Sequence, residues 1–132
     1  MKKQTYNCVL LIDDDKITNY INQRMVKKLH LSDHIQMTES VQEGLRFIED
    51  YKNTHEGCSP DLIFLDVNMP GMKGFDFLKA YEQIPFTNKE EVKIIVISAS
   101  SNDRDRDRID QYNLPYLTKP LTMEKISELL GL

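Results

Sequence analysis

The sequence predicts an α/β fold of the doubly wound type, in which helices cover both faces of a parallel sheet. Five strand-like segments alternate along the chain with five segments of helical spacing. The runs at 8–12, 62–65 and 92–97 are continuously apolar or nearly so, which is typical of strands buried on both faces. Right-handed crossovers then place all five strands in one parallel sheet, which binds ligands at the carboxyl ends of its strands.

The first half of the chain contributes two strand and helix pairs. A strand is expected over 8–12, followed by a helix that Asp15 caps. The segment 34–38 alternates, with Ile35 and Met37 on one face, and predicts a short strand. A capping box, Ser40 to Glu43, opens the second helix. The apolar residues at helical spacing in the two helices are Ile17, Tyr20, Ile21, Met25 and Leu29 in the first and Val41, Leu45 and Ile48 in the second.

The second half contributes three more pairs. After a polar loop at 53–60, strands are expected at 62–66, 92–98 and 115–118. A third helix follows the first of these strands, and the charged segment 102–112 is expected to form the fourth. Thr122 is expected to cap the last helix and Gly131 to end it. The apolar residues expected to anchor these three helices are Phe75, Leu78, Ile84, Ile109, Tyr112, Ile126, Leu129 and Leu130.

Size and charge exclude several classes of protein. The chain has 132 residues, which predicts one domain. Its net charge of −4 argues against a surface that follows nucleic-acid phosphates. No apolar stretch is long enough to span a membrane or to act as a signal peptide, so we expect a cytoplasmic protein. Cys8 and Cys58 lack metal-ligand or redox spacing and are expected to be reduced.

Carboxylates follow two of the predicted strands. Asp13, Asp14 and Asp15 come directly after the first strand, and Asp66 ends the third. Because the carboxyl ends of parallel strands share one edge, Asp13, Asp14 and Asp66 are expected to converge there, whereas Asp15 is better explained as a helix cap. Hard oxygen ligands of this kind favour Mg²⁺.

Other matching positions complete a family resemblance. Ser98 ends the fourth strand and Lys119 follows the fifth, so both are expected at the same edge. The chain resembles, over nearly its whole length, the receiver domain of two-component response regulators. The matching segments are Leu11-Ile12-Asp13-Asp14, 66–74, Ser98-Ala99 and Tyr116-Leu117-Thr118-Lys119-Pro120. The resemblance implies a flavodoxin-like (βα)5 fold with strand order 2-1-3-4-5. Because the chain ends at Leu132, we expect a single-domain, chemotaxis-regulator-like protein without an output domain.

The resemblance also implies residue roles. Asp66 would accept a phosphoryl group from a histidine kinase, a phosphotransfer protein or a small donor. Asp13, Asp14, Asp66 and the backbone carbonyl of Asn68 would hold Mg²⁺. Lys119 and Ser98 would contact phosphoryl oxygens, and Ser98 with Tyr116 would act as the switch. The protein would then be a phosphoacceptor with slow self-dephosphorylation, not an enzyme, and would signal to an unknown protein target as a monomer or transient dimer.

Two other functions and one departure stay open at this point. A Mg²⁺-dependent phosphohydrolase of the haloacid dehalogenase type also uses an aspartate nucleophile, but it needs a second acid at the position of Asn68. A pseudo-receiver would bind partners without phosphorylation, which the complete set of expected site residues disfavours. The departure is Asn113-Leu114-Pro115, where family members commonly carry Gly-Ala. We expect it to affect how the fourth helix meets the last strand.

Overall fold

Five strands and five helices form the described part of the chain, in the predicted order. The computed structural model describes residues 6–54, 60–68, 74–84, 92–98 and 103–132. The strands are β1 (Val9–Ile12), β2 (Ile35–Thr38), β3 (Leu62–Asp66), β4 (Lys93–Ser98) and β5 (Tyr116–Thr118). The helices are α1 (Lys16–Lys28), α2 (Val41–Thr54), α3 (Gly74–Gln83), α4 (Asp103–Gln111) and α5 (Met123–Leu130). The α/β class is confirmed.

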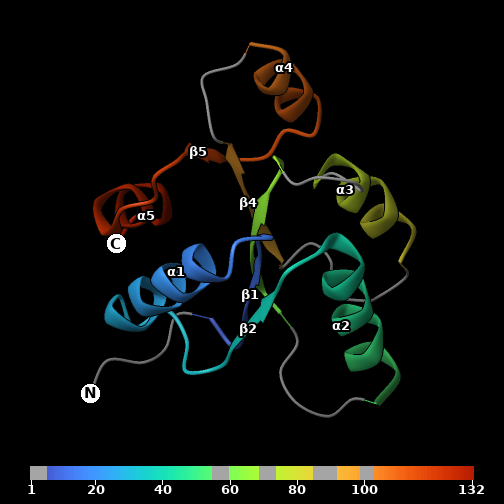
Figure 1. Cartoon of the computed structure of the whole chain (residues 1–132), viewed down its shortest axis with the longest axis horizontal. Helices are drawn as coiled ribbons and strands as arrows, with labels where there is room; N and C mark the ends of the chain where they lie inside the picture. The colour runs from blue at the N-terminus through green and yellow to red at the C-terminus, as the bar shows by residue number, and fades with distance from the viewer. Residues whose placement is uncertain (1–5, 55–59, 69–73, 85–91, 99–102) are drawn as a thin grey trace.

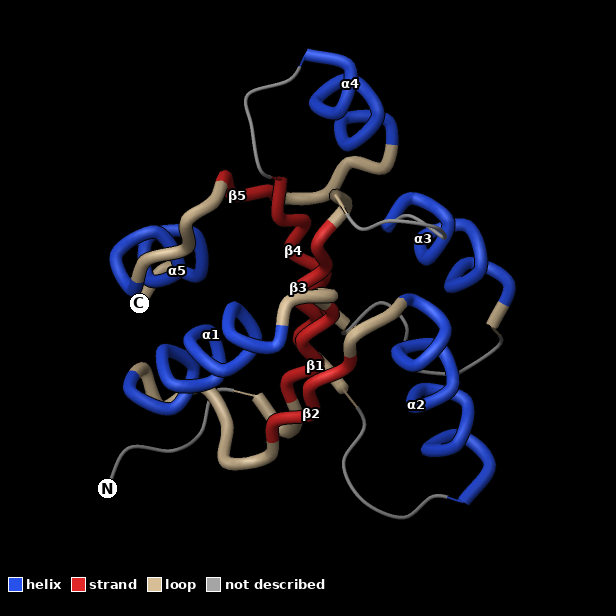
Figure 2. The backbone as a smooth tube through the Cα atoms, in the orientation of Figure 1, coloured by secondary structure: helices blue, strands red, loops and turns tan. Residues whose placement is uncertain are grey.

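All strand pairs are parallel, and the sheet has the order β2-β1-β3-β4-β5. Figure 1 shows α1 and α5 on one face of this sheet and α2 and α3 on the other. In Figure 2 the strands form a central layer between the two groups of helices. The doubly wound fold with order 2-1-3-4-5 is therefore confirmed, and β3 has the central place that its apolar sequence predicts.

The sheet has a hydrophobic core on each face. Successive strand residues point to opposite faces, so Leu10 and Ile12 belong to one core and Val9 and Leu11 to the other. Helices α2, α3 and α4 close the first core, with Ile48, Phe75, Leu78 and Ile109 buried in it. Helices α1 and α5 close the second through Val26 and Ile126. Both faces of the central strands are thus inaccessible to water, which explains their continuous apolar runs.

Most of the predicted helix anchors are buried. Val41, Ile48, Phe75, Leu78, Ile84, Ile109 and Ile126 are buried, and Leu45, Tyr112, Leu129 and Leu130 are half-buried against the cores. The charged helix α4 has a further contact, because the guanidinium of Arg108 lies 3.9 Å from the ring centre of Phe75 in α3.

Helix α1 buries only part of the apolar set that identified it as a helix, since Met25 and Leu29 pack half-buried against the second core. Ile17, Tyr20 and Ile21 are 70%, 54% and 50% exposed, whereas Asn19 and Asn22 are buried. Val26 packs in the second core, whereas Asn19, nearer the start of the helix, meets the ends of β1 and β2, where backbone carbonyls need hydrogen-bond donors. Asn19 supplies such donors. The helix is therefore confirmed, but of its five predicted apolar positions only Met25 and Leu29 lie on the buried side.

The predicted helix caps are confirmed. Side chains of Asp15, Ser40 and Thr122 accept hydrogen bonds from backbone N–H groups in the first turns of α1, α2 and α5. Gly131 ends α5 in the left-handed region, with φ 72°.

Asn113 makes the turn between α4 and β5. Its φ is 57°, a left-handed conformation that asparagine adopts more readily than most residues other than glycine. Its backbone N–H donates to the carbonyl of Asp110 at 3.0 Å. Asn113 therefore supplies the left-handed residue of a tight turn between α4 and β5.

Some predictions fall outside the described residues. They concern the loop at 55–59 with Cys58, the motif residues 69–73, Ala99 and Asn102. Among the described helices, none combines the length and apolarity that a membrane span requires.

Candidate functional site

The register of β1 and β3 brings the predicted acids together. Ile12 of β1 pairs with Leu65 of β3, so the residues that follow them, Asp13 and Asp66, lie side by side at the carboxyl edge. One carboxylate oxygen from each of Asp13, Asp14 and Asp66 lies within 4.8 Å of the others. Asp13 and Asp66 are buried and Asp14 is exposed. The cluster therefore opens to solvent on the side of Asp14.

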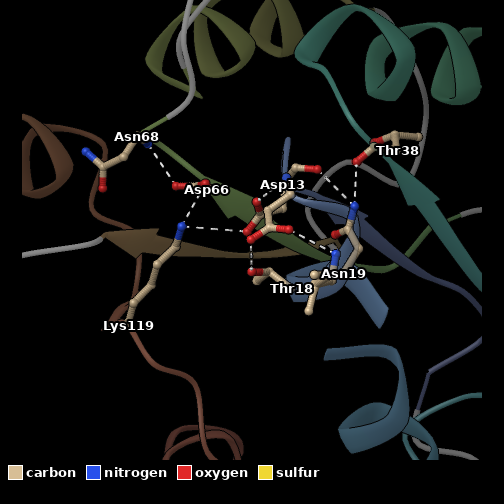
Figure 3. A network of polar contacts seen from close by, with 9 residues as sticks. Asp13, Thr18, Asn19, Thr38, Asp66, Asn68 and Lys119 are labelled. Carbon is tan, nitrogen blue, oxygen red and sulfur yellow. Dashed lines mark hydrogen bonds and ion pairs between the residues drawn. The ribbon is translucent and has the colours of Figure 1, made fainter. Parts of the chain in front are cut away.

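Lys119 reaches the same cluster from β5. Thr118 pairs with Ser98, and the backbone N–H of Lys119 donates to the Ser98 carbonyl at 2.8 Å. The Lys119 ammonium donates to Asp66 Oδ2 at 3.0 Å and lies 3.7 Å from Asp13 Oδ2 (Figure 3). Ser98 is buried at the end of β4. The carboxyl ends of β1, β3 and β5 thus bring together Asp13, Asp14, Asp66 and Lys119, and Ser98 lies at the same edge of the sheet at the end of β4.

Asn68 and Tyr116 occupy the flanks of the site. The backbone N–H of Asn68 donates to Asp66 Oδ1 at 2.8 Å, which is an Asx turn that holds the chain close to the Asp66 carboxylate. Tyr116 pairs with Val96 across β4 and β5, and its half-buried side chain packs against the core on the α2 and α3 face.

Asp15 serves as a helix cap, as the sequence predicts. Its carboxylate accepts hydrogen bonds from the Ile17 backbone N–H and the Thr18 hydroxyl, both at 3.0 Å. The Thr18 hydroxyl, followed by the Ile17 N–H, holds the pKa of Asp15 below its usual value. Both oxygens of Asp15 are therefore engaged away from the cluster of the other three acids.

Burial and neighbouring charges act strongly on the Asp13 carboxyl group. Burial raises its pKa from 3.8 to about 6, and the charges of Asp66 and Asp14 add to the rise, while the Asp15 N–H and the Lys119 ammonium oppose it. Asp13 Oδ1 accepts a hydrogen bond from the Asp15 N–H at 2.9 Å. Asp13 Oδ2 is buried and accepts no hydrogen bond from the part of the chain that the structure describes.

Lys119 is held in its charged form by the same acids. Burial by itself lowers the pKa of its ammonium, but the hydrogen bond with Asp66 and the charges of Asp66, Asp13 and Asp14 outweigh burial, so the pKa is raised. Of these groups, the nearest carboxylate oxygen belongs to Asp66.

The donor set fits a divalent cation. Three carboxylates face one ammonium, which leaves excess negative charge, and Asp13 Oδ2 lacks a hydrogen-bond donor among the described residues. Mg²⁺ binds oxygen at about 2.1 Å, so oxygens on opposite sides of one ion are about 4 Å apart. The oxygens of the three acids all lie within 4.8 Å of one another, which is near enough for one such ion to contact all three.

Asn19 is a site residue that sequence reasoning missed. Its side-chain amide donates to the backbone carbonyls of Asp13 and Thr38 at 2.9 and 3.0 Å (Figure 3). The Thr38 carbonyl also accepts from the Asp13 N–H at 3.1 Å. These hydrogen bonds hold the backbone of Asp13 against the end of β2. The sequence offered one sign of this role: Asn19 lies on a different face of α1 from the apolar residues Ile17, Tyr20 and Ile21.

Gly74 is a second residue whose importance the sequence did not reveal. A Cβ atom at this position would lie 2.7 Å from the Asp66 carbonyl oxygen and 2.7 Å from Val67 Cα. Backbone atoms of this kind cannot move aside as a flexible side chain can. The absent side chain therefore allows the first residue of α3 to pack directly on the strand end that carries Asp66.

Comparisons with known proteins show the family to which the chain belongs. A family model described as the response regulator receiver domain matches residues 9–131. The probable C4-dicarboxylate response regulator DctR of Halalkalibacterium halodurans is 30% identical over 131 residues, covering 98% of this chain and 52% of that protein. The chemotaxis protein CheY of Bacillus subtilis is 25% identical over 124 residues, covering 93% of each.

A solved structure is also similar over nearly the whole chain. The crystal structure of a two-component response regulator from Cytophaga hutchinsonii has a TM-score of 0.83 at 26% identity, with 97% of this chain and 96% of that chain covered. Several curated relatives are longer, since the chain spans about half of DctR and 13% of the sensor kinase/phosphatase LuxN of Vibrio campbellii. The family match extends from β1 to the end of α5 and includes every strand that forms the site, so the chain belongs to the response regulator receiver domain family.

Proposed function

We propose that the protein accepts one phosphoryl group on a carboxylate oxygen of Asp66 and signals by a change in partner binding. The observation that carries the proposal is the Lys119 ammonium 3.0 Å from Asp66 Oδ2, within a cluster of acids that fits a divalent cation. A carboxylate can attack an anionic phosphoryl group when positive charge offsets their repulsion.

The proposed reaction makes one bond and breaks one. An Asp66 oxygen attacks phosphorus while the bond from phosphorus to the donor breaks, which is a P–N bond in a phosphohistidine and a P–O bond in acetyl phosphate. The electron pair of that bond leaves on the imidazole nitrogen or the acetate. The phosphoryl group then occupies Asp66 as an acyl phosphate, and water later hydrolyses it slowly. The phosphorylated protein is the signalling state, and the protein does not turn over a substrate steadily as an enzyme does.

The Asp13, Asp14 and Asp66 carboxylates, with the Asn68 backbone carbonyl, would hold Mg²⁺. When bound, Mg²⁺ supplies positive charge that offsets the repulsion between Asp66 and the phosphoryl oxygens. The Asn68 carbonyl would supply the fourth oxygen, since the Asx turn keeps this residue against Asp66.

Lys119, Ser98 and Tyr116 would stabilise and report the phosphorylated state. The Lys119 ammonium would move from Asp66 Oδ2 to a phosphoryl oxygen, which keeps its charge paired. The Ser98 hydroxyl would donate to another phosphoryl oxygen. Because Ser98 and Tyr116 lie on adjacent strands, movement of Ser98 can reach the Tyr116 side chain and change the surface beside it.

A histidine kinase or phosphotransfer protein would deliver the phosphoryl group over α1. Ile17, Tyr20 and Ile21 form an exposed apolar surface on this helix. Ile21 also lines a hollow together with Lys119, whose ammonium contacts Asp66. A protein that brings its phosphohistidine to Asp66 would therefore cover this surface.

The test is stoichiometric labelling. Incubation with acetyl phosphate and Mg²⁺ should add one phosphate to the intact protein by mass spectrometry, and EDTA should prevent it. Asp66→Asn should not be labelled, whereas Asp110→Asn, which makes the same change at an exposed position in α4, should be labelled like the wild type. Equal labelling of Asp66→Asn would overturn the assignment. Sustained release of phosphate from phosphoesters would instead support a phosphohydrolase, and a folded protein that accepts no phosphate would support a pseudo-receiver.

A further inference from the structure

Lys125 makes two hydrogen bonds to the backbone around Lys119. Its ammonium donates to the carbonyl of Thr118 at 3.0 Å and to the carbonyl of Pro120 at 2.9 Å. These are the carbonyls on either side of Lys119 in the chain. Lys125 lies in the first turn of α5 and reaches back across the loop from β5.

Lysine is unfavourable at this place in a helix. Thr122 is the N-cap of α5, and its side chain accepts from the Lys125 backbone N–H at 3.1 Å. Three residues after such a cap, glutamate or glutamine completes a capping box, and a cation in the first turn faces the positive end of the helix dipole. A residue that breaks the local preference commonly has a role elsewhere in the structure.

For Lys125, that role is to bind the Thr118 and Pro120 carbonyls. Thr118 ends β5, which is a strand of three residues at the edge of the sheet, so none of the described strands pairs with its outer side. On the inner side, the Lys119 backbone N–H is fixed by the Ser98 carbonyl at 2.8 Å. Lys125 thus holds the outer side of the segment whose inner side is held by β4.

We infer that Lys125 is a positioning residue, which holds the backbone on both sides of Lys119 so that the Lys119 ammonium meets Asp66. The inference rests on the proposed function of Asp66. A lysine side chain is flexible, so the position of its ammonium depends on a fixed backbone origin. A displacement of about 1 Å at a reacting group can cost up to about 100-fold in rate.

The experiment compares phosphorylation rates with acetyl phosphate and Mg²⁺ in the full chain. Lys125→Met should slow labelling of Asp66 on the order of 10-fold. Lys125→Arg should retain most of the rate, because a guanidinium can also donate to two carbonyls. Lys79→Met, which removes the same charge from an exposed position in α3, should react like the wild type.

A double-mutant cycle separates positioning from general stability. In a Lys119→Met background, Lys125→Met should have no further effect on the rate, because its action passes through Lys119. Hydrogen exchange of the Lys119 amide, followed by NMR without donor or Mg²⁺, should become several-fold faster in Lys125→Met and stay unchanged in Lys79→Met. If Lys119→Met reacts too slowly to measure, the exchange rate of the Lys119 amide decides whether Lys125 positions this segment.

The outcomes are distinct. A wild type that accepts no phosphate would end the proposed function itself. A labelled wild type with an equally fast Lys125→Met, or with unchanged exchange at the Lys119 amide, would overturn the inference about Lys125 alone. Independent, multiplicative effects of the two substitutions would also overturn it.

Discussion

Replacing Asp13 by asparagine should stabilise the metal-free protein near neutral pH. The folded state raises the pKa of this buried carboxyl group from 3.8 to about 6. Between these two values the folded protein keeps the proton and the unfolded chain releases it, so this group makes the free energy of unfolding fall as pH rises. Each pKa unit corresponds to about 1.4 kcal/mol, so ionised Asp13 costs up to about 3 kcal/mol above pH 6.

Asparagine removes the charge and keeps the shape. Its side-chain oxygen can still accept the hydrogen bond that Asp13 Oδ1 receives from the Asp15 N–H. We therefore expect Asp13→Asn to be more stable than the wild type by about 1–3 kcal/mol at about pH 7.5 in EDTA, and by much less at about pH 4, where Asp13 is mostly protonated in the folded protein.

The assay is urea unfolding followed by far-UV circular dichroism, since the chain has no tryptophan. Mg²⁺ should stabilise the wild type and should stabilise Asp13→Asn less, because binding to the folded state adds to its stability. Glu49→Gln, the same kind of change on an exposed position of α2, should stay within about 0.5 kcal/mol of the wild type. If Asp13→Asn were no more stable at about pH 7.5, or showed the same gain at both pH values, the electrostatic reasoning would be wrong.

Three further substitutions test how the site is built and reached. Gly74→Ala should lower the free energy of unfolding in urea by about 1–3 kcal/mol, because the new Cβ meets backbone atoms. Gly44→Ala should cost less, because its Cβ meets the end of the Ile12 side chain, and equal costs would contradict the packing argument. Asn19→Ala should cost about 2 kcal/mol and weaken Mg²⁺ binding in calorimetric titration, and unchanged Mg²⁺ affinity would remove it from the site. Ile17→Ser should slow phosphotransfer from a phosphohistidine protein on the order of tenfold and leave labelling by acetyl phosphate unchanged. An equal effect on both donors would exclude a role of Ile17 in docking the donor protein.

The order of elements was predictable because it depends on short-range patterns. Continuous apolar runs marked the buried strands, and residues such as Asp15, Thr122 and Gly131 marked helix ends by chemistry that acts within one turn. The convergence of Asp13, Asp66 and Lys119 followed from one topological rule, since parallel strands present their carboxyl ends at a common edge.

The sequence by itself therefore determined the sheet, its helices and which acids meet at its edge. Tertiary structure alone decided which face of α1 is buried, why Gly74 has no side chain and what Lys125 contacts. Each of these depends on how one element packs against the end of another: carbonyls at strand ends need a donor, or backbone leaves no room for a side chain. Helical spacing places Ile17 and Asn19 on different faces, but it does not show which face meets the sheet, because burial is a property of the partner surface.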